Sequence, residues 1–360
     1  MTTKARKLAD LGNVYDDGAL SNRNLIINGA MQVAQRGTSF TPSAAATTYT
    51  LDRFSFYQNA GTVGVDQATD SPDGFEYSLK CEVDATGSVA SDTILQVGQP
   101  IEGYNLAPLD WNGGSNAQPA TASFWVKSSE TGVYGFRIRL GGAGTFIKEF
   151  TINSSNTWEQ KTVLIPACPY TIPNKTNATG IFTGVQLVSG STYHAASDGV
   201  WQTADAYGTS GMDNDWITTS GATFQITGVQ LEVGDTATPF EHRSYGDELA
   251  RCQRYFQVFE EDGDTTFGST VAYATNAAYD GTQHIFPVEM RASPTRSTSG
   301  TWQVTDGTGG GAGITAFYGN NTKWGYQLGA GVASGLTTGK LYFIRALSGT
   351  GSKLKFDAEL

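Results

Sequence analysis

Short segments in which apolar and polar residues alternate recur along most of the chain. From Tyr77 to Val83, from Thr121 to Lys127 and from Tyr134 to Leu140, apolar side chains occupy every second position. This spacing is typical of an antiparallel strand with one buried face. Gly, Asn, Pro and Ser, which favour tight turns, separate the segments. The pattern predicts an all-β protein, with a β-sandwich or barrel over residues 24–244.

One segment has a different period. Between Tyr245 and Phe259 the apolar residues fall at helical spacing, and Gly246 and Asp247 can start the helix. We therefore expect a helix from Tyr245 to Phe259, within a connecting segment of residues 245–262. Strand-like segments resume after Gly263 and predict a smaller C-terminal β domain over residues 263–360.

A five-residue sequence occurs twice in the first β region. Thr-Gly-Val-Gln-Leu at residues 183–187 returns at residues 227–231, a spacing of 227 − 183 = 44 residues. A single recurrence does not indicate a propeller, which needs several copies. We expect the two copies to be strands of one sheet with similar packing.

Composition narrows the classes of function. The net charge is 23 − 34 = −11, which disfavours a nucleic-acid partner because phosphate binding needs a basic face. The three cysteines, Cys81, Cys168 and Cys252, are too widely spaced for a disulfide framework or a metal motif. We expect reduced thiols in a protein made in a reducing cytosol, with neither a signal peptide nor a membrane-inserted segment.

The first 23 residues carry the only basic cluster of the chain, Lys4, Arg6 and Lys7. They lack the apolar pattern of a folded core, so residues 1–23 are interpreted as an extended arm that orders on a partner. Two alternatives stay open at this point: a docking arm for an acidic partner, or a solvated tail.

Motifs for catalysis or cofactor binding do not stand out. The three histidines have no zinc-like spacing, and no phosphate loop or nucleophile elbow occurs, so no cofactor is expected. Glu260-Glu261-Asp262 could serve a glycosidase, although acids in such loops are usually solvated turns. Asp213 and Asp215 are weak calcium candidates beside the simpler interpretation of an ordinary loop.

Aromatic residues in irregular segments are the candidates for glycan binding, because sugar rings stack on exposed Trp and Tyr rings. The candidates are Trp111, Trp201, Tyr207, Trp216, Tyr318, Trp324 and Tyr326. For each ring alone, packing in a core or between subunits is the alternative. Because the chain is acidic, we expect any glycan contact to use aromatic and neutral polar groups rather than charge.

Three stretches resemble virion proteins of tailed bacteriophages. They are residues 24–39 with 51–54, residues 226–233 with 238–244, and residues 249–256 with 286–295. Together they resemble tail-fibre and receptor-binding subunits over residues 24–300. The first two stretches also bracket a domain similar to carbohydrate-binding jelly-roll modules, which often open with an Asn-Leu-x-x-Asn-Gly strand, here residues 24–29.

The resemblance implies a non-enzymatic structural subunit of a bacteriophage virion, made in the host cytoplasm. It implies a jelly-roll sandwich over residues 24–244, a homotrimer, and a role as a tail-fibre or receptor-binding protein in host attachment. Host surface polysaccharide is then the candidate receptor. The virion-attachment arm would contact other tail or virion proteins through Lys4, Arg6, Lys7, Leu8 and Leu11. The alternatives are a head decoration or connecting protein without a receptor role, and a polysaccharide depolymerase.

Overall fold

The computed structural model describes residues 22–212, 215–260, 266–279, 283–308 and 311–360. The described residues are nearly all in strands and turns, which confirms the all-β prediction. They divide into two units, residues 22–248 with Leu360 and residues 249–359. The candidate attachment residues Lys4, Arg6, Lys7, Leu8 and Leu11 lie outside the described residues.

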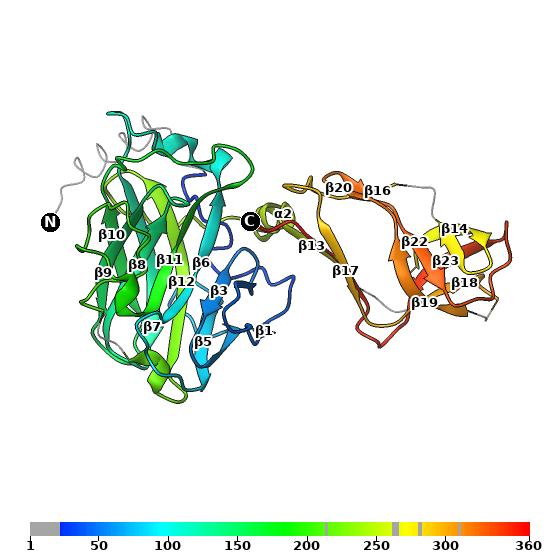
Figure 1. Ribbon diagram of the computed structural model, residues 1–360, viewed down its shortest axis with the longest axis horizontal. Coiled ribbons are helices and arrows are strands. Elements are labelled where there is room, and N and C mark those ends of the chain that lie inside the picture. The colour runs from blue at the N-terminus through cyan, green and yellow to red at the C-terminus, as the bar shows by residue number, and fades with distance from the viewer. Residues whose placement is uncertain (1–21, 213–214, 261–265, 280–282, 309–310) are drawn as a thin grey trace. The chain divides into compact units, whose positions relative to one another are not determined.

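The first unit is a sandwich of two six-stranded antiparallel sheets (Figure 1). Sheet I has the order β1 (Ser39–Phe40), β4 (Thr62–Ala68), β5 (Ser78–Ala85), β12 (Thr223–Val233), β7 (Ala120–Ser128) and β10 (Glu159–Ile165). Sheet II has the order β2 (Thr48–Tyr49), β3 (Ser55–Gln58), β6 (Ile94–Glu102), β11 (Thr179–Ser189), β8 (Gly132–Arg139) and β9 (Thr145–Ile152). The chain crosses repeatedly between the sheets, as in a jelly roll, and the successive strands β2–β3, β4–β5 and β8–β9 pair within one sheet. Short 3₁₀ turns cover Gly103–Leu109 (η1), Ser191–Tyr193 (η2) and Trp216–Thr218 (η3).

The alternating segments bury their apolar positions between the two sheets. Phe124 of β7 stacks on Phe136 of β8 with ring centroids 5.6 Å apart, and it meets Phe150 of β9 edge to face at 5.3 Å. Burying a side chain of this size contributes about 1.5–3 kcal/mol. Cys81 and Cys168 are buried in the same core as free thiols.

The repeated pentapeptide does not lie in one sheet. Residues 183–187 belong to β11 of sheet II, and residues 227–231 belong to β12 of sheet I. Each strand is the fourth in its sheet, so the copies occupy equivalent positions in opposite layers. The expectation of one sheet was wrong because the alternation reports which face is buried, not which strand lies alongside.

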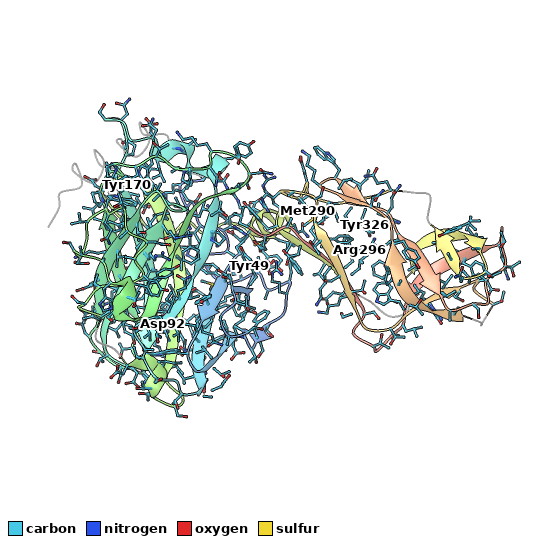
Figure 2. All side chains as sticks on the ribbon, in the orientation of Figure 1. Tyr49, Asp92, Tyr170, Met290, Arg296 and Tyr326 are labelled. Carbon is cyan, nitrogen blue, oxygen red and sulfur yellow. The ribbon has the colours of Figure 1, made fainter. Side chains whose placement is uncertain are left out.

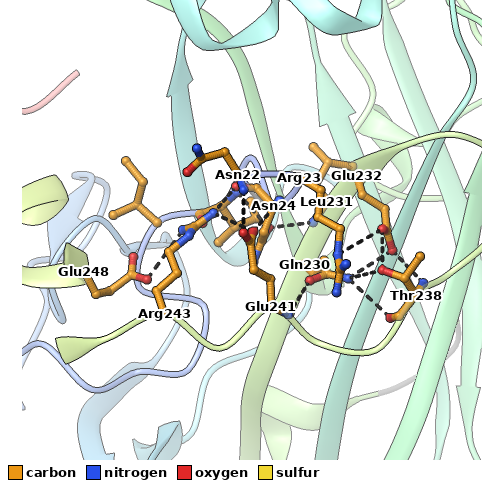
Figure 3. Close-up of polar contacts among 12 residues, drawn as sticks. Asn22, Arg23, Asn24, Gln230, Leu231, Glu232, Thr238, Glu241, Arg243 and Glu248 are labelled. Carbon is orange, nitrogen blue, oxygen red and sulfur yellow. Dashed lines mark hydrogen bonds and ion pairs between the residues drawn. The ribbon is translucent and has the colours of Figure 1, made fainter. Parts of the chain in front are cut away.

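Residues 22–24 are attached to β12 by a group of polar side chains that we call the N-terminal clasp (Figure 3). Its members are Asn22, Arg23, Asn24, Gln230, Glu232, Thr238, Glu241, Arg243 and Glu248. The side-chain oxygen of Asn24 accepts hydrogen bonds from the amides of Ile26 (2.9 Å) and Leu231 (3.1 Å). Its side-chain nitrogen donates to the carbonyl of Val229 (3.1 Å). One asparagine therefore ties the start of the sandwich to β12.

Arg243 is the centre of the clasp. Its guanidinium donates to the carbonyls of Ile26 (3.0 Å) and Asn24, and it forms ion pairs with Glu241 (3.1 Å) and Glu248 (3.5 Å). The Arg243 side chain is only 7% exposed. Two of the stretches that carry the phage resemblance, residues 24–29 and 238–244, thus meet in a structural contact.

The clasp should make the sandwich sensitive to acid through Glu241. Burial raises the pKa of this carboxyl, but the Asn24 amide and the Arg243 charge lower it more, so its pKa lies below the ordinary 4.5. A depressed pKa means that the stabilisation is present above pH 4.5 and is lost as the pH falls through the folded-state value. We expect Glu241→Gln to be less stable than the parent at neutral pH and to lose less stability on acidification. Urea unfolding followed over that pH range measures both effects, and parallel pH curves for the two proteins would contradict the prediction.

The predicted connecting helix is shorter than expected. Helix α2 spans Tyr245–Gln253, and Phe256–Glu260 is strand β13, paired antiparallel with β24 (Lys353–Asp357). The prediction of a helix to Phe259 was wrong because the apolar residues at 255, 256 and 259 suit either period. The strand state of Phe256 and Phe259 depends on a partner strand about a hundred residues away in sequence. No helix in the described part of the chain is long and apolar enough to cross a membrane.

The second unit contains a closed six-stranded barrel and two three-stranded sheets. The barrel order is β14 (Thr266–Ala274), β15 (Ala277–Tyr279), β22 (Gly329–Val332), β19 (Gly311–Tyr318), β18 (Trp302–Thr305) and β23 (Leu341–Ala346). One sheet joins β13, β24 and β17 (Thr295–Ser299), and the other joins β16 (His284–Ile285), β21 (Gly325–Tyr326) and β20 (Asn321–Thr322). Trp302, Tyr342, Ile344 and Phe356 are among the residues of its core.

Candidate functional site

Three of the predicted glycan-binding tryptophans are core residues. Trp111 and Trp216 are at most 1% exposed and Trp201 is 8% exposed. The indole of Trp111 meets that of Trp201 edge to face at 5.3 Å and donates to the carbonyl of Gln118 (2.7 Å). Trp201 donates to the carbonyl of Pro166 (2.8 Å). Their prediction as stacking platforms was wrong, because all three indoles pack in the hydrophobic core of the sandwich.

Of the three predicted glycan-binding aromatics in the second unit, one is buried and two are exposed. Tyr326 is buried and stacks on His284 with centroids 5.0 Å apart, so it is unsuitable as an exposed platform (Figure 2). Tyr318 and Trp324 are exposed, and the ammonium of Lys323 lies 4.4 Å from the Trp324 ring centroid. These two rings remain candidates.

The acidic candidates gain no support from their surroundings. Asp213 lies outside the described residues, while Asp215 is exposed and its carbonyl accepts the amide of Thr218 (2.8 Å). Glu260 forms an ion pair with Lys353 (2.5 Å), and Glu261 and Asp262 are outside the described residues. Among the described residues, no group of three or more His, Cys, Asp or Glu side chains could hold a metal ion.

A groove of about 570 Å³ crosses the outer face of sheet II. The side chains of a strand alternate between faces. Phe56, Val97, Val185 and Phe136 are buried, so the residues next to them in sequence point outward. Strands β2 to β8 of sheet II line the groove with Tyr49, Ser55, Tyr57, Ile94, Gln96, Pro100, Thr179, Phe182, Arg137 and Arg139. Thr47 and Leu360 lie at its border. Tyr193, Asp205 and Tyr207 join the lining from the irregular chain between β11 and β12. We call this feature the sheet II groove; Tyr49 is labelled in Figure 2.

Two glycines face each other in adjacent strands of sheet II. Gly98 of β6 lies directly opposite Gly184 of β11 in the register. A Cβ atom at Gly184 would approach the carbonyl oxygen of Val97 to 2.2 Å, and one at Gly98 would approach that of Thr183 to 2.3 Å. Neither position can carry a side chain, and the ring of Phe182, which lines the groove, lies against Gly98.

Tyrosines border the groove on both sides. Tyr49 of β2 and Tyr57 of β3 come from one side of sheet II, and Tyr193 and Tyr207 come from the segment that covers β8 and β9. The latter two rings meet edge to face at 5.2 Å, and the Tyr207 amide donates to the Tyr193 carbonyl (2.8 Å). All four rings are partly exposed.

Arg137, Arg139 and Asp205 supply the charge of the groove. Asp205 accepts from Arg137 Nη2 (2.7 Å) and from Nε and Nη2 of Arg139 (both 2.8 Å). The guanidinium carbon of Arg137 lies 3.7 Å from the ring centroid of Tyr207. Burial lowers the pKa of Arg137 to about 10, which leaves it charged at neutral pH.

Of the seven predicted aromatics, the groove contains Tyr207 alone. Six lining residues were not predicted from the sequence: Tyr49, Tyr57, Tyr193, Phe182, Arg137 and Arg139. One signal was available: in the alternating segment from Tyr134 to Leu140, Arg137 and Arg139 occupy the outward positions. The other lining residues belong to strands whose order in the sheet the alternation does not reveal.

No family model matches the chain, and no curated protein matches it. Among solved structures, the chain is similar to the enzymatically active domain of tailspike protein 4 of bacteriophage CBA120, at 14% identity and a TM-score of 0.34, over 59% of this chain and 21% of that one. It is also similar to TmCBM61 in complex with β-1,4-galactotriose, at 12% identity and a TM-score of 0.29, over 59% of this chain and 99% of that one. A family 11 carbohydrate-binding module from Clostridium thermocellum matches at 10% identity and a TM-score of 0.26, over 57% of this chain and 98% of that one.

Proposed function

We propose that the chain is a carbohydrate-binding structural subunit of a bacteriophage virion and that it holds host surface polysaccharide in the sheet II groove. The observation that carries the binding part is the groove itself, with tyrosines on both sides. Its volume of about 570 Å³ lies in the range of small-ligand sites. Tyr57 and Tyr207 offer ring faces to the apolar faces of sugars, while Gln96 and Thr179 offer neutral hydrogen-bonding groups.

The virion part of the proposal is supported by the sequence resemblance of residues 24–300 to tail-fibre and receptor-binding subunits. We propose a position on the particle surface and a homotrimer, whose linked weak sites would act together. Electron microscopy of particles labelled with antibody against this chain tests the location. Label on the tail supports receptor binding, label on the head supports the decoration alternative, and unlabelled particles contradict the virion assignment.

The groove favours binding over hydrolysis. Glycoside hydrolases use a pair of carboxyl groups that flank the scissile bond. Asp205 supplies the one acidic side chain among the described residues that line the groove, and two guanidiniums hold it. We therefore propose a subunit without depolymerase activity, and release of reducing ends from host polysaccharide would contradict this.

Tyr57→Ala tests the binding groove. Loss of one stacking ring should weaken binding of host polysaccharide fragments about tenfold, equivalent to about 1.4 kcal/mol. Isothermal titration on the full chain measures the affinity. Trp158→Ala is the matched control, because Trp158 is an aromatic residue beside sheet I that donates to Asp70 (3.2 Å) and lies outside the groove. Equal affinities for the two variants would remove the groove as the binding site.

A further inference from the structure

We infer that the sheet II groove selects an acidic glycan, whose carboxylate binds the guanidinium of Arg139. This inference rests on the proposed function, since it names the class of sugar that the same groove binds. It concerns uronic-acid polymers, in which each acidic residue carries one carboxylate.

The first step is the charge of the groove. Its charged lining side chains are Arg137, Arg139 and Asp205, which sum to 2 − 1 = +1, whereas the whole chain carries −11. One carboxylate is thus shared by two guanidiniums, and one positive charge in the groove has no counter-ion among the described side chains that line it. A neutral sugar would leave that charge unpaired.

The second step separates the two arginines. Arg137 is 1% exposed, and its three nitrogens donate to the Ala206 carbonyl (2.7 Å), the Gln96 side chain (3.3 Å) and Asp205 (2.7 Å). With every nitrogen used and Tyr207 over its face, Arg137 is a positioning residue. It holds Asp205 and Tyr207 in place, and its buried positive charge adds to the electrostatic potential of the groove.

Arg139 is the arginine that a ligand can reach. Its side chain is 37% exposed, and both of its hydrogen-bonding nitrogens, Nε and Nη2, point to the same partner, Asp205. Nη1 of Arg139 makes no hydrogen bond within the described part of the chain. An incoming carboxylate can accept from this free nitrogen, and such charge-assisted hydrogen bonds are stronger than those between neutral groups.

The acidic character of the chain does not oppose this local pairing. At physiological ionic strength, exposed charges separated by more than about 8 Å are largely screened. The electrostatic energy of a carboxylate in contact with Arg139 therefore depends more on the charges of the groove than on those of the distant surface. This revises the expectation from the sequence that glycan contact avoids charge.

The experiment compares oligouronates with the same oligomers after chemical reduction of their carboxyl groups, which keeps the backbone and removes the charge. We expect the full-length parent to bind at least one oligouronate about tenfold more tightly than its reduced form. Arg139→Gln should bind the oligouronate and the reduced oligomer with about equal affinity, so that the parent's preference for the charged form is lost. Arg139→Lys, which keeps the charge, should retain part of the preference. Lys80→Gln on β5 of sheet I is the control for the same loss of charge outside the groove.

The possible outcomes separate this inference from the function on which it rests. Equal binding of both oligomers, unaffected by Arg139→Gln but weakened by Tyr57→Ala, would overturn the acidic class and keep glycan binding in the groove. No binding of any oligouronate or reduced oligomer would overturn the inference as well, and the Tyr57→Ala experiment with host polysaccharide would then decide the proposed function by itself.

Discussion

Arg243→Ala should lower the free energy of unfolding of the sandwich by about 3–5 kcal/mol, the loss that follows removal of one partner from a buried ion pair. The substitution leaves the carboxylates of Glu241 and Glu248 and the carbonyls of Asn24 and Ile26 without this donor. Since Asn24 also holds the amide of Leu231, the loss should spread to β12. Urea unfolding of the full chain gives the stability, and hydrogen exchange at the Leu25 and Leu231 amides locates the loss.

Lys80→Ala is the comparison for this experiment. Lys80 forms a single ion pair with Glu82 on the surface of β5, and its side chain is 26% exposed. Pairs of this kind contribute about 0–1 kcal/mol, so the control should unfold almost like the parent. If Arg243→Ala unfolds at the same urea concentration as Lys80→Ala, the clasp does not stabilise the sandwich as described.

The clasp shows that residues which carry a sequence resemblance can have a structural role. The stretches around Asn24 and Arg243 carry the resemblance to phage proteins, and the structure places both in one structural contact. Their residues hold the start of the sandwich against β12, so they indicate the fold rather than the ligand. The strands themselves were predictable because period-two alternation marks a buried face, as in β5, β7 and β8.

The groove was less predictable for a physical reason. Its sides are formed by residues far apart in the chain, such as Tyr57 and Tyr207, which are 207 − 57 = 150 positions apart. Which strands lie side by side is decided by pairing over the whole sheet, and alternation within one strand carries no information about it. The exposure of an aromatic ring in an irregular segment is equally hidden, because the same composition suits a binding loop and a segment that covers a core.

Tyr207 and Trp216 lie close together in sequence, and they allow a test that distinguishes a residue of a binding site from a residue that covers the core. Trp216 is fully buried in η3, among the core residues of the sandwich, while Tyr207 is partly exposed at the groove. Trp216→Ala should lower the free energy of unfolding by about 3–5 kcal/mol, the usual cost of truncating a large buried aromatic residue. The fraction that remains folded should bind glycan with the parent affinity, because the indole does not line the groove. Tyr57→Ala should show the opposite combination, weaker binding at nearly parental stability. Urea unfolding and titration of both variants measure the two quantities. A Trp216→Ala protein of parental stability with impaired binding would show that Trp216 belongs to the binding surface.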